Sequence, residues 1–333
     1  MEIVEKRLIR LQGRSKMCHA STFLKTGSGR ELTAWFGGER EGSDDTSIWL
    51  SMREKEQTEF SPPELLHQNE EPHWNPVLFQ KDDRTIWLFF KIGKSIHSWR
   101  TYLMESTDGG SSWTEARELV SGDVGGRGPV KNKPIKLYDG MILAPASFES
   151  DEWWAFVDIY DGSKDRWHKS NEIHIELQGQ QKAFSKDIPV SEQSFHGRGV
   201  IQPTLWQDGE RAVHMLMRSS EGTLYKSDSE DGGENWCRAY SIRIPNNNSG
   251  IDLDKMPDGR IALVCNPVSG NWGERTPLEL FVSDDNGMTF GRSLVLETGE
   301  GEYSYPSVTA KDDHLYITYT YNREAVAYMK IKY

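Results

Sequence analysis

The sequence predicts an all-β protein, a six-bladed β-propeller whose blades are four-stranded antiparallel sheets. Three observations lead to this fold class. A hairpin-like segment recurs six times along the 333 residues, a polar string that ends in an aromatic residue recurs between these segments, and no helix-period segment of useful length appears. Four strands per unit, at a spacing of about 50 residues, are typical of propeller blades.

The recurring polar string is the clearest signal. It reads STDGGSSW from Ser106 to Trp113, SEDGGENW from Ser229 to Trp236 and SDDNGMTF from Ser283 to Phe290. In the shared pattern Ser-x-Asp-x-Gly-x-x-aromatic, Ser and Asp accept hydrogen bonds from nearby backbone amides, and Gly adopts the positive φ of a tight turn. The aromatic side chain then covers apolar surface between strands. Each string therefore predicts a hairpin tip with a mostly buried aromatic residue, on the face of the disc away from the pocket.

The six hairpin segments align at equivalent starting positions. These positions are Ser21, Pro76, Pro134, Pro203, Asp252 and Pro306, which gives steps of 55, 58, 69, 49 and 54 residues. The last unit ends in AVAYMKIKY and supplies only three strands, whereas the N-terminal EIVEKRLIRL alternates in polarity and can supply the fourth. Such pairing would close the ring and remove exposed sheet edges. No linker divides the chain, so we expect one domain over residues 1–333.

Composition narrows the possible partners. The net charge of −12 disfavours nucleic acid, which requires a basic surface, and no apolar run is long enough for a membrane helix. The N-terminal segment lacks the apolar run of a signal peptide, and three cysteines without ligand spacing are expected to be reduced thiols. We therefore expect a cytoplasmic protein. Dispersed histidines without metal-ligand spacing predict no metal site, and no cofactor is expected.

In such a fold, the residues before each inner strand and after each second strand gather at one mouth of the disc. This mouth is the predicted functional site. The predicted substrate-binding residues are Arg40, Trp74, Asn75, Lys91, Lys133, Glu149, Gln202, Arg218 and Arg275, and the predicted catalytic residues are His19, Asp44, Asp45, Tyr303 and Tyr305. Arg323 belongs to the wider set of mouth residues.

These strings resemble the Asp-box (BNR) repeats of the sialidase superfamily. Over essentially its full length, the chain is similar to the bacterial group described as predicted neuraminidase-like. The residues that carry the resemblance are the three Asp-boxes together with CHAST…AWFGGEREGSDD, WNPVLF, KNKPI, NSGID and GEYSYPS. The resemblance implies arginines that hold a substrate carboxylate, a tyrosine nucleophile activated by a glutamate, and an aspartate acid/base.

The family's functional residues map onto this chain in part. Arg218 in QDGERAVHMLMRSSEG and Arg275 in ERTPLELFVSDDNG match two of the three arginines. Tyr303 or Tyr305 matches the nucleophile, and Asp44 or Asp45 matches the acid/base.

Two positions depart from the family pattern. His19 stands in place of the first arginine, and Val200 or Ile201 stands in place of the glutamate. A neutral tyrosine without a base is a weak nucleophile. The resemblance therefore implies an exo-glycosidase on a terminal acidic sugar, with an altered catalytic set.

Two other functions remain open. A lyase that cleaves a uronate linkage, as in rhamnosyl-glucuronate, would use Arg218 and Arg275 to neutralise the carboxylate, His19 as base and a tyrosine as acid. A non-catalytic carbohydrate-binding propeller would instead use aromatic platforms such as Trp74 and Trp99. In each case the expected partner is an acidic sugar or oligosaccharide, with neither nucleic acid nor membrane.

Overall fold

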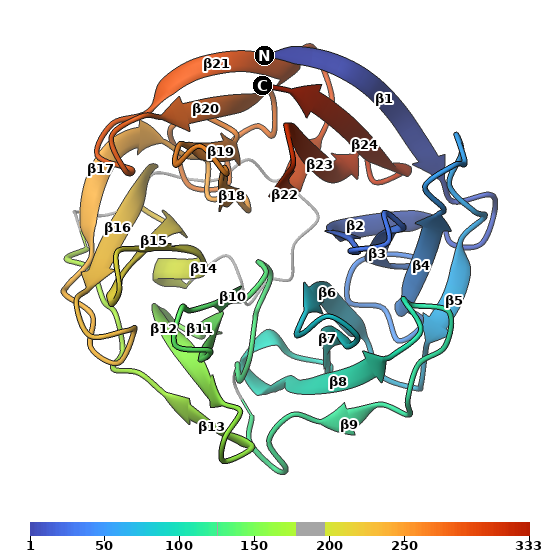
Figure 1. The fold of residues 1–333 in the computed structure, drawn as a ribbon, viewed down its shortest axis with the longest axis horizontal. Helices are drawn as coiled ribbons and strands as arrows, with labels where there is room; N and C mark the ends of the chain where they lie inside the picture. The colour runs from blue at the N-terminus through green and yellow to red at the C-terminus, as the bar shows by residue number, and fades with distance from the viewer. Residues whose placement is uncertain (125, 178–196) are drawn as a thin grey trace.

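A computed structural model describes residues 1–124, 126–177 and 197–333. The described chain folds into antiparallel sheets, and its one helical element is the 3-10 turn η1 (Ile96–Ser98). Figure 1 shows these sheets arranged in chain order around a common centre. The prediction of an all-β fold built from four-stranded antiparallel sheets is confirmed. None of the described helical structure is long and apolar enough to cross a membrane.

Consecutive strands group into six units, each numbered from its innermost strand outward. Unit 1 holds β2 (Met17–Lys25), β3 (Glu31–Gly38), β4 (Ser47–Arg53) and β5 (Glu64–His67); unit 2 holds β6 (His73–Gln80), β7 (Ile86–Ile92), β8 (Arg100–Ser106) and β9 (Arg117–Glu118). Unit 3 holds β10 (Ile135–Lys136), β11 (Ile142–Glu149), β12 (Glu152–Asp161) and β13 (Arg166–Lys169); unit 4 holds β14 (Arg198–Asp208), β15 (Ala212–Ser219), β16 (Thr223–Ser229) and β17 (Tyr240–Pro245). Unit 5 holds β18 (Asp252–Lys255), β19 (Ile261–Cys265), β20 (Leu278–Ser283) and β21 (Gly291–Glu297); unit 6 holds β22 (Tyr303–Lys311), β23 (His314–Tyr321), β24 (Ala325–Lys332) and β1 (Glu2–Arg10).

Two of the units are joined along their strands. β12 pairs in parallel with β14 through Glu152 with Arg198 and Trp153 with Gly199, so units 3 and 4 form one eight-stranded sheet. The pairing involves only these residues, and the other strand pairs within the two units are antiparallel.

The N-terminal strand belongs to the last unit. β1 pairs antiparallel with β24 from Glu2 opposite Lys332 to Arg10 opposite Ala325, and it is the outermost strand of unit 6. Figure 1 places the two chain ends side by side at this sheet. The alternating N-terminal segment thus supplies the strand that the C-terminal unit lacks.

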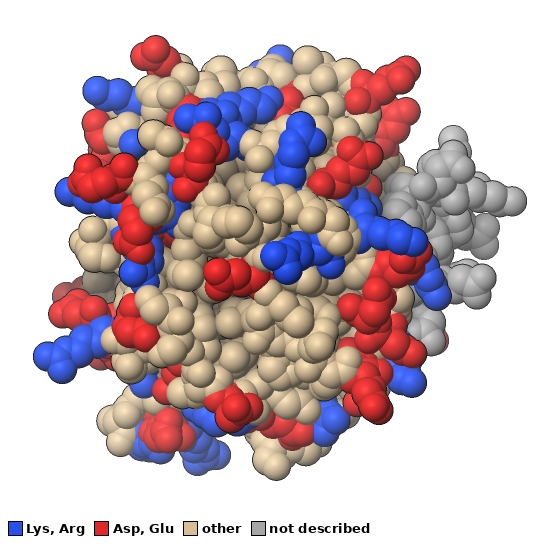
Figure 2. Space-filling view, turned by 90° about the vertical axis from the view of Figure 1, so that its right-hand side faces the viewer, with Lys and Arg blue, Asp and Glu red and all other residues tan. Residues whose placement is uncertain are grey.

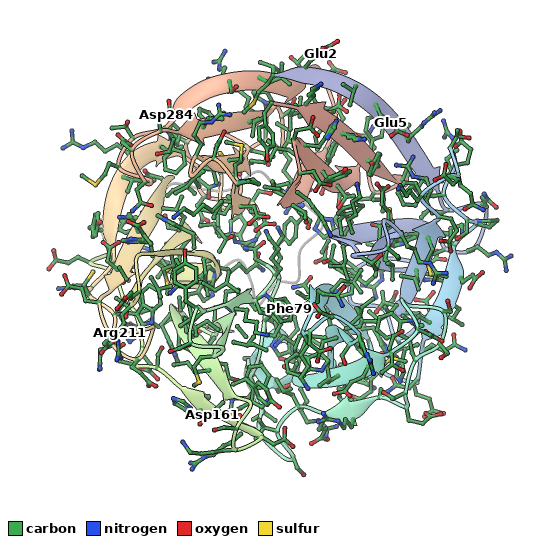
Figure 3. The ribbon with its side chains drawn as sticks, in the orientation of Figure 1. Glu2, Glu5, Phe79, Asp161, Arg211 and Asp284 are labelled. Atoms are coloured by element: carbon green, nitrogen blue, oxygen red, sulfur yellow. The ribbon has the colours of Figure 1, made fainter. Side chains whose placement is uncertain are left out.

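Apolar side chains fill the space between neighbouring units. The second strands β3 and β7 are buried along their whole length, so both of their faces pack against other elements. One cluster joins units 1 and 2 through Phe36, Trp74 and Phe90. The charged side chains of Asp161, Arg211 and Asp284 lie at the rim, as Figure 3 shows. This packing holds the inner strand ends in fixed positions around the centre.

The three Asp-box strings form the same bonded turn between the third and fourth strands of units 2, 4 and 5. In unit 2, Ser106 Oγ donates to Asp108 Oδ1 (2.8 Å), Gly110 N donates to Ser106 Oγ (2.8 Å) and Ser112 N donates to Asp108 Oδ1 (2.9 Å). The equivalent bonds recur in the other two strings at 2.8–3.0 Å. These bonds are the ones that the sequence pattern predicts.

Burial of the tip aromatics differs among the three tips. Trp236 is 5% exposed and its Nε1 donates to Gly233 O (2.8 Å), so its predicted burial is confirmed. Trp113 and Phe290 are half-buried and pack against the edges of two core clusters.

Candidate functional site

The innermost strands of four units bend at the same point. Ala20, Asn75, Gln202 and Tyr305 have positive φ values of 51°, 39°, 51° and 53°, and each lies where the pairing of the first and second strands changes register. A bulge of this kind redirects a side chain and is common beside functional sites. Asn75, Gln202 and Tyr305 are brought by these bulges to the wall of one pocket.

This central pocket is narrow and partly open to solvent. Its walls combine aromatic rings with a few polar groups, as ligand pockets usually do. The lining residues are Glu41, Trp74, Asn75, Ile96, Trp99, Glu149, Gln202, Arg218, Trp272 and Tyr305. Six of them (Trp74, Asn75, Glu149, Gln202, Arg218 and Tyr305) are among the site residues predicted from the sequence.

Arg218, near the end of β15, is the central cation of the pocket. Its side chain is 2% exposed, and Nη1 donates to Tyr305 Oη (2.6 Å) and to Gln202 Oε1 (3.1 Å). Its Nε has no hydrogen-bond partner, and no carboxylate forms an ion pair with it, among the residues that the structure describes. A buried guanidinium without a counter-ion is costly, whereas a bound anion would supply strong forked hydrogen bonds.

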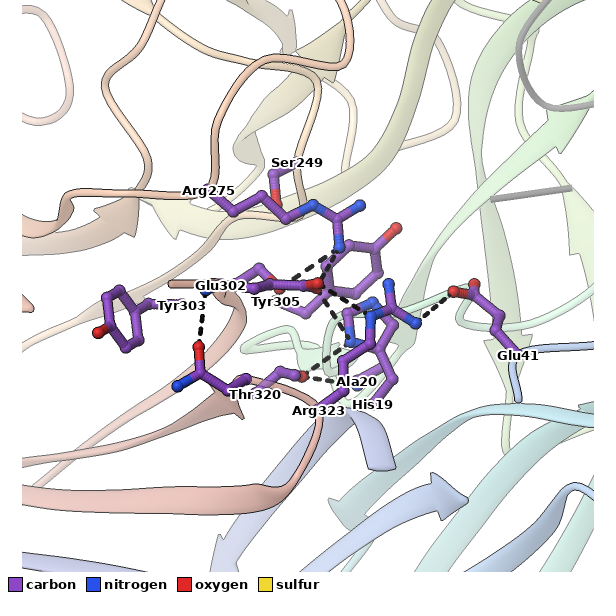
Figure 4. Close-up of polar contacts among 12 residues, drawn as sticks. His19, Ala20, Glu41, Ser249, Arg275, Glu302, Tyr303, Tyr305, Thr320 and Arg323 are labelled. Atoms are coloured by element: carbon purple, nitrogen blue, oxygen red, sulfur yellow. Dashed lines mark hydrogen bonds and ion pairs between the residues drawn. The ribbon is translucent and has the colours of Figure 1, made fainter. Parts of the chain in front are cut away.

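Tyr305 lies at the meeting point of the charged groups, as Figure 4 shows. The guanidinium carbons of Arg218 and Arg275 lie 5.5 and 5.4 Å from its ring centroid, and the imidazole of His19 lies 4.2 Å from it. The Tyr305 hydroxyl bonds to Arg218 and lines the pocket. Two guanidinium groups and one imidazole therefore pack against this ring.

Arg275 is held by a carboxylate of the protein. Its Nη1 lies 2.5 Å from Glu302 Oε1, while Arg323 Nε donates to Glu302 Oε2 (3.0 Å) and Arg323 Nη1 donates to Glu41 Oε2 (2.6 Å). Burial opposes ionisation of Glu302, but the two arginines lower its pKa to about 2. We expected Arg218 and Arg275 to face one pocket together; Arg218 lines it, whereas Arg275 is neutralised by Glu302 beside it.

Glu149, at the end of β11, is a second unusual group of the pocket. Burial raises the pKa of its carboxyl, although Arg218 acts in the opposite direction. Its Oε1 is buried and has no hydrogen-bond partner within the described chain. A carboxyl group with a raised pKa keeps its proton to a higher pH than an ordinary glutamate and can deliver that proton to a ligand.

His19 lies behind Tyr305 rather than at the pocket wall. It is 1% exposed, and its Nδ1 lies 2.9 Å from Thr320 Oγ1 in unit 6. Burial, together with the nearby Arg323, Arg275 and Arg218, holds the pKa of His19 well below its usual value. The imidazole is therefore neutral, and its place suits orienting Tyr305 better than contacting a substrate.

Besides His19 and Arg275, four more predicted residues do not line the pocket. The ring of Tyr303 packs against Tyr321 in a core cluster, and its hydroxyl donates to Glu300 O (3.1 Å). The loop after β3 leaves Arg40, Asp44 and Asp45 exposed. A hydrogen bond from the Glu39 amide to Asp45 Oδ2 (2.9 Å) stabilises the turn of this loop. Of the two tyrosines and the two aspartates left open by the sequence, only Tyr305 contacts Arg218.

Lys91 and Lys133 also point elsewhere. Lys91 Nζ is buried beside Thr101 Oγ1 and Arg127 O, both at 2.6 Å, and burial lowers its pKa to about 7. Lys133 Nζ donates to Asp252 Oδ2 (3.1 Å) and Leu253 O (2.8 Å). Neither lysine lines the pocket, because both ammonium groups link neighbouring segments.

Sequence reasoning did not select Glu41, Trp272 or Glu302 for the site. Glu41 lies in the same loop as Asp44 and Asp45. The acidic composition of this loop therefore indicated a pocket residue, but the prediction selected Asp44 and Asp45 rather than Glu41. Glu302 directly precedes the predicted Tyr303. No local pattern indicates Trp272, which enters the pocket from the β19–β20 connection.

Among the described residues, no group of three or more His, Cys, Asp and Glu side chains could hold a metal ion.

Comparison with known proteins identifies the fold. A family model described as a BNR repeat-like domain matches residues 29–317. No protein with a curated function matches the sequence. A Dyadobacter fermentans protein of unknown function superposes with a TM-score of 0.77 at 14% identity, covering 99% of this chain and 98% of that one. A Hadza microbial sialidase superposes with a TM-score of 0.76 at 16% identity (98% and 68% covered). The Trypanosoma rangeli sialidase in complex with the inhibitor DANA superposes with a TM-score of 0.71 at 11% identity (95% and 55% covered).

Proposed function

The chain belongs to the BNR repeat-like domain family, and from the pocket it carries we propose that it is a carbohydrate-active enzyme. The proposed reaction is removal of a terminal acidic sugar from a saccharide, by a sialidase-like exo-glycosidase with an altered catalytic set. The observation that carries the proposal is Arg218, a buried guanidinium at a pocket wall without a carboxylate partner in the described chain. The sialidases with a similar fold support a sugar as the ligand.

We further infer that the six units are the blades of one propeller domain, with the eight-stranded sheet counting as two blades. The pairing of β1 with β24 supports closure of the ring. In this arrangement, strand ends from units 2, 3, 4 and 6 converge at the pocket through Asn75, Glu149, Gln202 and Tyr305.

In the proposed reaction, Arg218 binds the sugar carboxylate through its free donor positions. Trp74, Trp99 and Trp272 bound the space for the sugar ring and limit access of water. Glu149 donates its proton to the leaving oxygen as the glycosidic bond breaks. Attack on the anomeric carbon comes from water or from the Tyr305 oxygen, and the attacking O–H passes its proton to Glu41, the other carboxylate of the pocket. If Tyr305 attacks, water then cleaves the glycosyl–tyrosine bond, returning a proton to Glu149 while the phenol regains the proton held by Glu41.

His19 has a positioning role in this proposal. Its ring packs on Tyr305 and its Nδ1 is bonded to Thr320, so it fixes the orientation of the phenol without touching substrate. The lyase alternative requires His19 as the base, and its place behind Tyr305 gives that alternative less support than the hydrolase.

Product analysis tests the proposal. The enzyme is incubated with oligosaccharides capped by sialic acid or by a uronic acid, and the products are separated and identified by mass. We expect release of the intact terminal acidic sugar by the wild type and by Arg40→Met, and none by Arg218→Met. An unsaturated uronic acid would identify a lyase. Binding of the capped saccharides without turnover would identify a binding propeller, and absence of binding would refute the proposal.

A further inference from the structure

A second groove lies at the seam between units 6 and 1, away from the central pocket. It is lined by parts of β1, β4 and β24 and by Lys25, the last residue of β2, whereas His19 and the pocket lie toward the start of that strand. The groove encloses about 940 Å3, part of it open to solvent. Glu5, labelled in Figure 3, stands on β1 at this edge of the molecule.

Each carboxylate that lines the groove is already paired. Glu5 Oε1 and Glu31 Oε2 each lie 2.6 Å from a terminal nitrogen of Arg53, which is buried between the rings of Phe60 and Tyr328. Glu54 Oε1 lies 2.6 Å from Arg30 Nη2. These acids therefore have little remaining capacity to neutralise other cations.

The lysines of the groove have no such partners. Lys25, Lys55 and Lys330 line it, and none forms an ion pair with a carboxylate in the part of the chain that the structure describes. Lys25 Nζ and Lys330 Nζ lie 4.5 and 5.7 Å from the ring centroid of the same tyrosine, Tyr316. Two like charges beside one ring repel each other unless an anion lies between them.

Tyr316 adds a hydrogen-bond donor to this pair. Lys25 Nζ donates to Tyr316 Oη (2.5 Å), so the hydroxyl hydrogen remains available for another acceptor. Burial, Lys330 and Lys25 all act to lower the pKa of the neighbouring His314, although Asp313 opposes them. Burial and the carboxylates of Glu31, Asp312 and Asp313 raise the pKa of Tyr316 itself, although Lys330 opposes them, so the hydroxyl keeps its proton.

The charge of the groove contrasts with that of the chain. Five basic residues (Arg7, Lys25, Arg53, Lys55 and Lys330) and three acidic residues (Glu5, Glu31 and Glu54) line it, which leaves a net charge of +2. The whole chain carries −12. Figure 2 views the side of the molecule that lies at the right of Figure 1 and shows basic and acidic side chains interspersed on it. A cluster of lysines without carboxylate partners among the described residues differs from this mixed charge pattern.

We propose that this groove binds a tetrahedral oxyanion, the sulfate or phosphate group of a small ester or the free ion, at the ammonium groups of Lys25, Lys330 and Lys55, while the buried Tyr316 hydroxyl holds Lys25 in place. Three ammonium donors that line one groove suit the several acceptor oxygens of such a group. The groove does not depend on the activity of the central pocket, because no residue lines both.

Calorimetric titration with inorganic sulfate, inorganic phosphate, glucose 6-sulfate and glucose 6-phosphate, at constant ionic strength, tests this site. We expect saturable binding of at least one of them to the wild type, weakened at least about tenfold in Lys25→Gln/Lys330→Gln. Tighter binding of the sugar esters would identify an esterified saccharide as the source of the anion, and equal binding would identify the free ion.

The matched control is Lys332→Gln/Lys136→Gln, which removes the same charge at exposed positions outside the groove. It should bind as the wild type does, and so should Arg218→Met. Equal weakening in the control would show a non-specific charge effect and overturn the proposal, as would a wild type that binds none of the four anions. If the double variant does not fold, Lys55→Gln and Tyr316→Phe are measured in its place, and unchanged binding in both overturns the proposal.

Discussion

The Asp-box tips and the central pocket use their polar groups in opposite ways. At each tip, the serine hydroxyl, the aspartate carboxylate and the glycine amide bond to one another within a single short string. At the pocket, Arg218 Nε and Glu149 Oε1, with His19 Nε2 behind Tyr305, are buried without a hydrogen-bond partner among the described residues. Leaving such groups unpaired lowers stability.

This contrast separates structural from functional polar residues. The bonds from Ser112 at one tip lower the pKa of Asp108 to about 2, because they favour its charged form. Burial at the pocket instead raises the pKa of Glu149. A carboxylate whose bonds outweigh its burial maintains a turn, whereas a carboxyl group whose burial outweighs the effects of Arg218, Gln202 and Lys91 is a candidate for chemistry with a ligand.

The largest expected effect compares two buried tyrosines of one strand. Tyr305→Phe removes the hydroxyl that Arg218 bonds and should lower turnover by about 10⁴-fold, the scale of losing a group that acts on the reacting atoms. Tyr303→Phe removes a hydroxyl that bonds to Glu300 O and Tyr321, away from the pocket, and should leave turnover within about threefold of wild type. Rates of terminal-sugar release from a capped oligosaccharide measure both. Similar losses in the two variants would break the distinction between pocket and core.

A variant at an Asp-box tip should lose stability but keep its preference among sugars. Trp236→Ala empties a buried site and should lower the free energy of unfolding by about 3–5 kcal/mol, measured by chemical denaturation. The affinity of the remaining folded protein for acidic over neutral sugars should not change, because Trp236 does not line the pocket. A changed preference would show that tips and pocket are not independent.

The pH dependence of sugar release tests whether Glu149 is the acid of the pocket. Since burial raises its pKa, the carboxyl is protonated below that pKa and loses its proton as the pH rises through it. The rate of sugar release should therefore fall on the alkaline side in the wild type. Glu149→Gln should lower the rate by about 10²-fold and remove this alkaline limb. An unchanged profile in Glu149→Gln would assign the acid to another residue.

The smallest effect concerns acid titration of the tips. The folded pKa values of Asp108 and Asp285 are lowered to about 2 from a usual 3.8, so the stability that they contribute is present above about pH 4 and is lost as the pH falls toward 2. Unfolding of wild type and of Asp108→Asn/Asp285→Asn is followed over this range. The variant should lose less stability on acidification; parallel curves would show that these carboxylates do not stabilise the tips.

Much of the fold was predictable because its signals are local. Each tip needs only the residues of its own string, such as Ser229, Asp231 and Gly233, and the alternation of Glu2–Arg10 was enough to predict its pairing with β24. The fusion of units 3 and 4 was not predicted, since it depends on how Trp153 meets Gly199 across a long connection.

The residues of the pocket were predictable where the position of a residue in its four-stranded unit determines which way its side chain points. Asn75, Gln202 and Tyr305 precede the first-strand prolines and reach the pocket at bulges. Lys91 and Asp45 occupy mouth-side positions in the sequence, but Lys91 bonds to the neighbouring strand at Thr101 and Asp45 bonds within its own loop to the Glu39 amide, so neither lines the pocket. The capture of Arg275 by Glu302, 27 residues later, involves side chains from two units, and no spacing rule indicates it.

The affinity of Arg218→Lys for an acidic sugar and for its neutral counterpart tests the central claim most directly. Lysine keeps the charge but loses the planar fork, so we expect binding of free sialic acid to weaken at least about 30-fold, while its methyl ester changes by less than about twofold. Arg275→Lys, whose native partner is Glu302, should weaken the acid less than Arg218→Lys does. Calorimetric titration of both ligands gives these values. Equal losses for acid and ester in Arg218→Lys would contradict the claim that this buried arginine is the anion receptor of the pocket.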